Sequence, residues 1–179
     1  MFFHVRDLAV RASQFDVEIA PGAIDFQQDA RDEDASLRPA GQLKVSGKAE
    51  LVLGSLGEIK VSGHIAVEML ADCDRCLEPA RFPIDSDFSL FYRPVEEGYG
   101  DEKEIDTGEA EMGFYQGDGL ELNDVVREFT LLALPMQRVC SASCKGICPA
   151  CGQNRNLKEC ACTAEMIDDR WAALKSLKT

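Results

Sequence analysis

Six of the eight cysteines fall in one short segment near the carboxy end, at spacings that suit metal binding. They follow the pattern Cys140-x3-Cys144-x3-Cys148-x2-Cys151-x8-Cys160-x-Cys162. Within it, Cys148-Pro-Ala-Cys151-Gly is a zinc-knuckle sequence, because two thiolates two residues apart at a tight turn point at one ion. The glycine lets backbone N–H groups approach the sulfurs. We therefore predict a structural zinc site of Cys148, Cys151, Cys160 and Cys162.

The other two cysteines, Cys73 and Cys76, form a similar pair directly after an apolar alternating run. With Cys140 and Cys144 they would make a second four-sulfur site, so the chain would hold one or two Zn²⁺ ions. That site would join segments about 64 residues apart, and closing so long a loop should stabilise the fold. A redox pair at 73 and 76 stays open as an alternative. A thioredoxin-like pair opens a helix, however, whereas prolines and alternating residues follow here.

Enzymatic chemistry has little support in this sequence. There are only two histidines, and His64 falls on the polar face of an expected strand, where we expect it to be exposed. Four cysteines around zinc make a closed set with no open position for a substrate. The glycine-rich stretches lack the strand–loop–helix context of a phosphate-binding loop. We therefore predict no catalytic residues and no small-molecule substrate.

The cysteines must be positioned by a β-sheet. Apolar and polar residues alternate over 42–53 and 59–69, and the Gly-Ser-Leu-Gly between them predicts a long hairpin. A third run over 82–92 contains Pro83, which indicates an edge position or a strand start. Shorter strands are expected at 15–20 and 112–115, and a polar loop at 27–38.

Two helices are expected. Leu122, Val125, Val126 and Phe129 recur at helical spacing, and Pro135 should end that helix, which we place at 122–134 with Asn123 as its N-cap. A short helix at 168–177 would present Trp171, Leu174 and Leu177 on one side.

These elements predict an α+β protein. It would have an antiparallel sheet, one main helix and a zinc-ribbon-like carboxy-terminal segment; whether the sheet closes into a barrel-like form stays open. We expect a β-rich domain at 1–135, with an acidic loop at 94–118, and a cysteine-rich tail at 136–179.

The charge is strongly acidic and uneven. The 179 residues include 32 acids and 19 bases, a formal charge of −13, and residues 94–128 hold −10 of it. Such a chain repels phosphate backbones at long range. It has no apolar run near the roughly 18 residues of a membrane span. Its start lacks the features of a targeting peptide, so we expect a reducing cytoplasm, in which clustered cysteines favour metal over disulfides.

Four ordered motifs carry a resemblance to a known family. They are Cys-Asp-Arg-Cys-Leu-Glu-Pro at 73–79, Leu-Leu-Ala-Leu-Pro ending at Pro135, the cysteine run at 140–152, and Asp-Arg-Trp-Ala-Ala-Leu at 169–174. Together they resemble the bacterial YceD-type family of large ribosomal RNA subunit accumulation proteins, over about residues 40–179. The resemblance implies a cytoplasmic, non-enzymatic factor that supports accumulation of 23S ribosomal RNA and is tied to a small zinc-ribbon protein of the large subunit.

The charge map suggests two hypotheses about partners. The acidic segment from Glu96 to Asp118 could imitate RNA and hold a basic protein of the large subunit before assembly. Alternatively, the cysteine-rich tail could contact 23S ribosomal RNA directly, through Arg138, Lys145, Arg155 and Lys158. A zinc-stabilised binding module in transcription is a further alternative.

Overall fold

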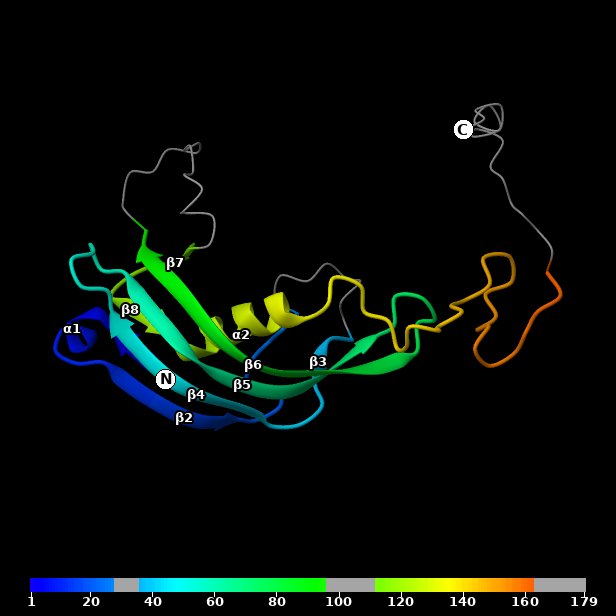
Figure 1. Cartoon of the computed structure of the whole chain (residues 1–179), viewed down its shortest axis with the longest axis horizontal. Coiled ribbons are helices and arrows are strands. Elements are labelled where there is room, and N and C mark those ends of the chain that lie inside the picture. The colour runs from blue at the N-terminus through cyan, green and yellow to red at the C-terminus, as the bar shows by residue number, and fades with distance from the viewer. Residues whose placement is uncertain (28–35, 96–111, 163–179) are drawn as a thin grey trace, which may run out of the picture. The chain divides into compact units, whose positions relative to one another are not determined.

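The computed structural model describes residues 1–27, 36–95 and 112–162. The chain divides into two compact units (Figure 1). The first comprises Met1–Ala71 and Arg81–Arg138, and the second Asp72–Ala80 and Val139–Thr179. The domain boundary predicted after residue 135 stays a prediction.

A six-stranded sheet dominates the described residues, with the order β2-β4-β5-β6-β7 and β3 paired to β5. The strands are β2 (Ser13–Ile19), β3 (Arg38–Pro39), β4 (Leu43–Leu51), β5 (Ile59–Asp72), β6 (Pro79–Pro94) and β7 (Met112–Tyr115). The sheet is open, since β2 and β7 lie at its ends, and it does not close into a barrel-like form.

The expectation of a wholly antiparallel sheet was wrong at one edge, because β7 pairs in parallel with β6. Parallel neighbours need a connection of about a dozen residues or more, and the chain between Pro94 and Met112 is long enough to supply it. Since β7 pairs only with Phe91–Pro94, no described strand covers that edge of β6 at Pro83. This agrees with the predicted edge position of the proline.

The predicted hairpin is confirmed as β4 and β5, which pair antiparallel from Lys44–Ala66 to Leu51–Ile59. Most of the alternating apolar residues of both strands are buried, with Val45, Ile59 and Ile65 almost fully so, whereas Leu51 is half-buried. The alternating pattern predicted that the first strand continues to residue 53, but Leu53 lies past the end of β4 and is 98% exposed.

Both strands of this hairpin contain the sequence Lys-Val-Ser-Gly, at 44–47 and 60–63. The register of the hairpin places Gly47 directly opposite Gly63. A Cβ at Gly47 would overlap the carbonyl oxygen of Ser62, and a Cβ at Gly63 would overlap that of Ser46. The two glycines therefore allow an unusually close approach of the two backbones.

We expect Gly47→Ala and Gly63→Ala each to lower the free energy of unfolding by about 1–3 kcal/mol, the usual cost of overpacking. Chemical denaturation monitored by circular dichroism would measure this. Gly41→Ala is the matched control, because no atom lies within 4 Å of its added Cβ and its φ is not positive. Equal midpoints for all three variants would contradict the packing role.

The main helix, α2 (Leu122–Ala133), lies across one face of the sheet in the first unit (Figure 1). Its Phe129 ring lies 5.1 Å from that of Phe88 in β6. The N-cap is Glu121, with ψ 132°, and Asn123 lies inside the first turn, so the predicted cap was wrong. The helix ends at Ala133 because Pro135 favours an extended conformation at the preceding Leu134.

The amino-terminal residues complete the first unit. β1 (Phe2–His4) pairs antiparallel with β8 (Gly119–Glu121), and α1 (Val5–Leu8) follows β1. Neither α1 nor α2, the helices of the described residues, has the length and apolar composition needed to cross a membrane. Residues 28–35 of the predicted polar loop, 96–111 of the acidic loop and the predicted helix at 168–177 lie outside the described residues.

Candidate metal centres

The sulfur atoms of the second unit gather into two groups of four. In the first group, those of Cys73, Cys76, Cys140 and Cys144 all lie within 4.8 Å of one another. The Sγ–Sγ distance is 3.9 Å between Cys73 and Cys144, and 3.8 Å between Cys76 and Cys140. A tetrahedral zinc ion with bonds of about 2.3 Å places its sulfurs about 3.8 Å apart. These two distances therefore match the spacing that such an ion requires.

The turn between β5 and β6 positions the first two of these sulfurs. The N–H of Leu77 donates to the carbonyl oxygen of Cys73 at 2.8 Å, and the N–H of Cys73 donates to that of Glu78 at 2.9 Å. Leu77 adopts a φ of +61°, a left-handed conformation that costs a leucine about 1–3 kcal/mol. Strain of this kind persists where other interactions, such as ligation of a metal by flanking thiolates, favour the turn.

A close backbone contact supports the first group from the carboxy-terminal side. The N–H of Ile147 donates to the carbonyl oxygen of Arg75 at 2.9 Å. Gly146 has a φ of +70°, and a Cβ there would lie 2.8 Å from the same oxygen. Glycine is therefore required beside this contact.

Backbone hydrogen-bond donors and neighbouring sulfurs shift the pKa values of thiols in the first group in opposite directions. Burial disfavours the thiolate of Cys73, but N–H groups of Cys140, Arg75 and Cys76 outweigh it and lower its pKa to about 6. The N–H of Glu78 favours the thiolate of Cys76, yet burial and three neighbouring sulfurs raise its pKa to about 12. Four thiolates repel one another at this distance, and a bound cation would remove that conflict.

The second group contains Cys148, Cys151, Cys160 and Cys162, whose sulfurs also lie within 4.8 Å of one another. Its first two cysteines lie at a tight turn, and the predicted zinc knuckle stays a prediction. The N–H of Gly152 donates to the carbonyl oxygen of Cys148 at 2.8 Å, and Gly152 has a φ of +72°.

The pKa values of its thiols are also shifted in opposite directions. N–H groups of Cys151 and Ala150 lower the pKa of Cys148 to about 6, whereas the sulfur of Cys151 raises the pKa of Cys162 to about 12. The second group is the more open of the two, because Cys151 and Cys162 are exposed and Cys73 is fully buried.

The structure thus brings together the same two sets of cysteines that the sequence grouped, and all eight are free thiols. Their role as metal ligands stays a prediction. Sequence reasoning missed Asn156, whose Nδ2 donates to the sulfur of Cys144 at 3.3 Å while its Oδ1 accepts from the N–H of Lys145 at 2.8 Å. No residue pattern in the sequence singled it out.

We expect Asn156→Ala to weaken zinc binding by the first group about 10- to 100-fold, as is typical when a hydrogen bond to a ligand is removed. Competition with a chromophoric chelator would measure it. Lys158→Ala, an exposed change nearby, should leave the affinity unaltered. Similar affinities for the two variants would show that Asn156 does not orient Cys144.

The remaining polar residues named from the sequence have ordinary surroundings. His64 is exposed, as predicted, and its ring nitrogens lie 3.0 Å from Asp85 and 2.9 Å from Asp87, which raise its pKa. Of the basic residues proposed for RNA contact, Lys145 forms an ion pair with Glu159 at 3.1 Å, and this lowers the pKa of the carboxyl.

Fold and site together define a class, a sheet-dominated α+β protein with two sets of four thiols that could hold metal. The sequence model of a family described as "Large ribosomal RNA subunit accumulation protein YceD" matches residues 61–178. The chain belongs to this family.

Similar proteins come from bacteria and plants. An uncharacterized protein of Mycobacterium tuberculosis is 32% identical over 117 residues, which cover 65% of this chain and 54% of the relative. A protein of Arabidopsis thaliana named "Large ribosomal RNA subunit accumulation protein YCED homolog 1, chloroplastic" is 25% identical over 147 residues, covering 68% of this chain and 44% of the relative. The match thus spans about half the length of these relatives. No solved structure matches the chain.

Proposed function

We propose that the protein is a non-enzymatic factor in biogenesis of the large ribosomal subunit, which supports accumulation of 23S ribosomal RNA in a reducing cytoplasm. The observation that carries this proposal is the match to the family over residues 61–178, together with the names of the plant relatives. All eight cysteines of the two groups fall inside the matched range.

We further propose that each group holds one structural Zn²⁺ ion in a zinc-ribbon-like segment. Four sulfurs within 4.8 Å of one another can complete the coordination of zinc and leave no position for a substrate, which supports a role without catalysis. The first ion would fasten the turn at residues 72–80 to the segment after Val139, within one unit. Binding energy of this kind is folding energy.

A basic protein of the large subunit is the partner that the charge favours. The chain carries −13 overall, and residues 94–128 hold −10 of it, so cations are attracted and phosphates repelled. Direct contact with 23S ribosomal RNA is the second candidate. The exposure of Arg155 and Lys158 in the second unit favours it.

Depletion of the chain in its own cells tests the proposed function. We expect the ratio of 23S to small-subunit ribosomal RNA to fall, and particles that sediment as incomplete large subunits to accumulate. The tagged chain should purify with those particles. An unchanged ratio would refute the proposal, and purification with RNA polymerase instead would favour the transcription alternative.

The salt dependence of binding in charge-removing variants distinguishes the two candidate partners. Replacing Arg155 and Lys158 with alanine should weaken binding to large-subunit RNA and flatten its salt slope, if the tail contacts RNA. Neutralising the acids from Glu96 to Glu111 should instead weaken binding to a basic large-subunit protein. Unchanged affinity and salt dependence after the second change would exclude the acidic segment as a binding surface.

A further inference from the structure

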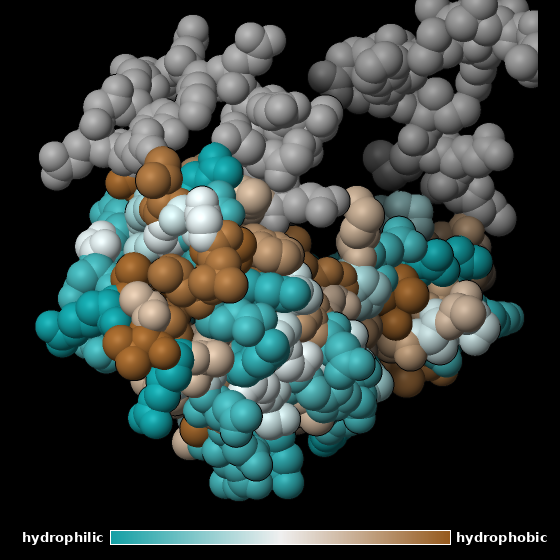
Figure 2. Space-filling view, turned by 60° about the vertical axis from the view of Figure 1, so that its left-hand side comes forward, coloured by the Kyte–Doolittle hydropathy of each residue, from teal (hydrophilic) through white to brown (hydrophobic). Residues whose placement is uncertain are grey.

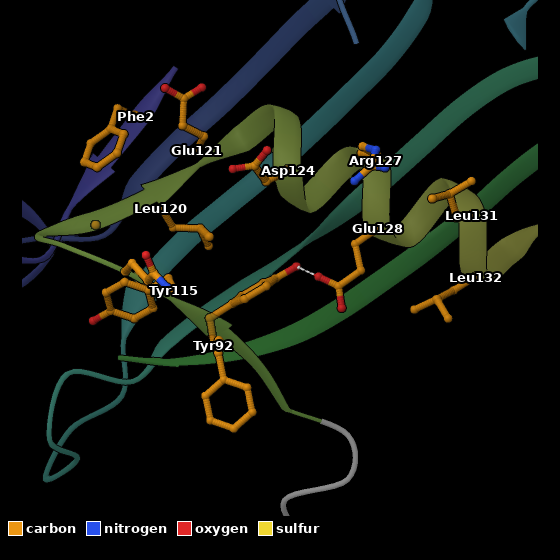
Figure 3. Close-up of a pocket in the computed structure, with 13 residues that line it drawn as sticks. Phe2, Tyr92, Tyr115, Leu120, Glu121, Asp124, Arg127, Glu128, Leu131 and Leu132 are labelled. Atoms are coloured by element: carbon orange, nitrogen blue, oxygen red, sulfur yellow. Dashed lines mark hydrogen bonds between the residues drawn. The ribbon is translucent and has the colours of Figure 1, made fainter. Parts of the chain in front are cut away.

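A groove opens on the first unit between β7, β8 and one side of α2 (Figure 3). Its volume is about 660 Å³. The side chains of Tyr92, Tyr115 and Leu120 are buried at its base, and Leu131 and Leu132 extend from the last turns of α2 at one end. The metal centres contribute no residue to it.

Several apolar side chains at the rim of this groove are exposed. Phe114 is 57% exposed and Leu132 is 69% exposed, and Phe2 and Leu131 also lie open. In the space-filling view that brings this end of the unit forward, hydrophobic residues gather beside hydrophilic ones (Figure 2). Contiguous apolar surface rimmed by polar residues marks an interaction site more often than chance exposure.

The base of the groove is held in place by hydrogen bonds. The hydroxyl of Tyr92 donates to the carboxylate of Glu128 in α2 at 2.6 Å, and the hydroxyl of Tyr115 donates to the carbonyl oxygen of Gly57 at 2.6 Å. Burial and the adjacent carboxylate raise the pKa of Tyr92, so this donor keeps its proton. A surface fixed in this way loses little freedom when a ligand binds.

The polar part of the groove is acidic. Glu121 and Asp124 are exposed along it, and within the described residues neither forms an ion pair. Arg127 also lines the groove, but its Nε donates to the carbonyl oxygen of Asp25 at 2.8 Å. With Glu128 included, the lining of the groove contains three carboxylates and one guanidinium. A ligand of this surface therefore needs cations beside apolar groups.

The charge of the chain argues against its own acidic segment as the occupant. Residues 96–111, which lead into β7, contain eight acids and one lysine, a net charge of −7. A segment of this charge is repelled by Glu121 and Asp124. The same carboxylates repel the phosphates of RNA.

We propose that this groove binds a cationic amphipathic peptide segment of a partner protein, in which apolar side chains are flanked by lysine or arginine. The apolar side chains contact Phe114 and Leu132, and the cations lie near Glu121 and Asp124. This inference rests on the proposed function, since it names the surface on which a basic large-subunit protein would dock.

The test uses the full chain and a defined probe, a fluorescent helical peptide of leucine and lysine with leucines on one face. We expect the probe to bind in fluorescence anisotropy, more weakly as salt rises, and to shift the amide NMR signals of Phe114, Glu121 and Leu132. The same peptide with glutamate in place of lysine should not bind.

Variants then assign the binding to the groove. Glu121→Gln with Asp124→Asn should weaken it about tenfold, and Leu132→Ser about fivefold, in line with the loss of complementary charge and apolar contact. The matched controls are Asp16→Asn with Glu18→Gln, which remove the same charge from β2, and Leu157→Ser, an exposed leucine of the second unit. Equal losses in variants and controls would overturn the proposal.

Other occupants give distinct results, each of which would also overturn it. These are an RNA oligonucleotide that shifts the groove signals, a peptide of residues 163–179 that displaces the probe, and a dimer in sedimentation that breaks on Leu132→Ser. Failure here leaves the proposed function standing if depletion still lowers 23S ribosomal RNA. Probe binding without any effect of depletion would refute the proposed function instead.

Discussion

Replacing Cys73 with serine is expected to lower the zinc content from about two ions per chain to about one. Cys73 is fully buried, and its sulfur lies 3.9 Å from that of Cys144 and accepts a hydrogen bond from the N–H of Cys140 at 3.3 Å. A serine hydroxyl cannot replace a thiolate ligand, so the ion of the first group should be lost. Elemental analysis of the purified full chain would measure it.

Loss of this ion should also break the contacts between the turn at 72–80 and the segment after Val139. Structural zinc contributes an apparent 10–16 kcal/mol or so in small zinc domains, far more than the hydrogen bonds of this turn. Limited proteolysis should therefore cut the second unit of the variant much faster.

Ala142→Ser is the matched control, because it adds an exposed serine between Cys140 and Cys144 and removes no sulfur. It should retain both ions. If the unaltered chain instead holds one ion and Cys73 and Cys76 cycle between dithiol and disulfide, the redox alternative is correct and the first metal centre is refuted.

The sequence was informative about the fold wherever alternation was long. The hairpin of β4 and β5 and the helix α2 follow from the positions of apolar residues, because each buries one face. The parallel pairing of β7 could not be predicted, since strand direction depends on the path of the chain before Met112. The facing of Gly47 and Gly63 also needed the register, which only the paired strands define.

The candidate centres were predictable to a similar extent. Cysteine spacing was enough to group the sulfurs, because two ligands two residues apart can reach one ion from a tight turn. Asn156 and the left-handed Leu77 were missed, since their roles arise from backbone geometry and contacts between loops. The groove beside α2 was missed for the same reason: Phe2, Phe114 and Leu132 come from separate elements.

The zinc affinity of the first group should fall steeply as the pH is lowered, by at least about 100-fold for each pH unit near neutrality. In the metal-free first group, the pKa of Cys76 is raised to about 12 and that of Cys140 is also raised, by Cys144 first and then by burial. Both thiols are protonated at pH 7. Because zinc binds thiolates, binding must release at least these two protons, and each released proton changes the affinity tenfold per pH unit.

The sign of this pH dependence follows from which state, metal-free or metal-bound, holds the protons. The metal-free state holds them and the metal-bound state does not, so acid favours release of the ion. Below about pH 6 the slope should steepen, since Cys73 and Cys148, with pKa values lowered to about 6, then take up protons as well. Chelator competition at half-unit steps between about pH 5 and 8 would measure the slope on both sides of pH 6.

His64→Gln is the control for this slope, since His64 has a raised pKa and could itself titrate in the same range. It lies on β5 in the first unit and contributes no atom to either cysteine group, so its replacement should leave the slope unchanged. A profile that is flat with pH, or one that His64→Gln abolishes, would show that the thiols of the two groups are not the atoms that exchange protons for metal.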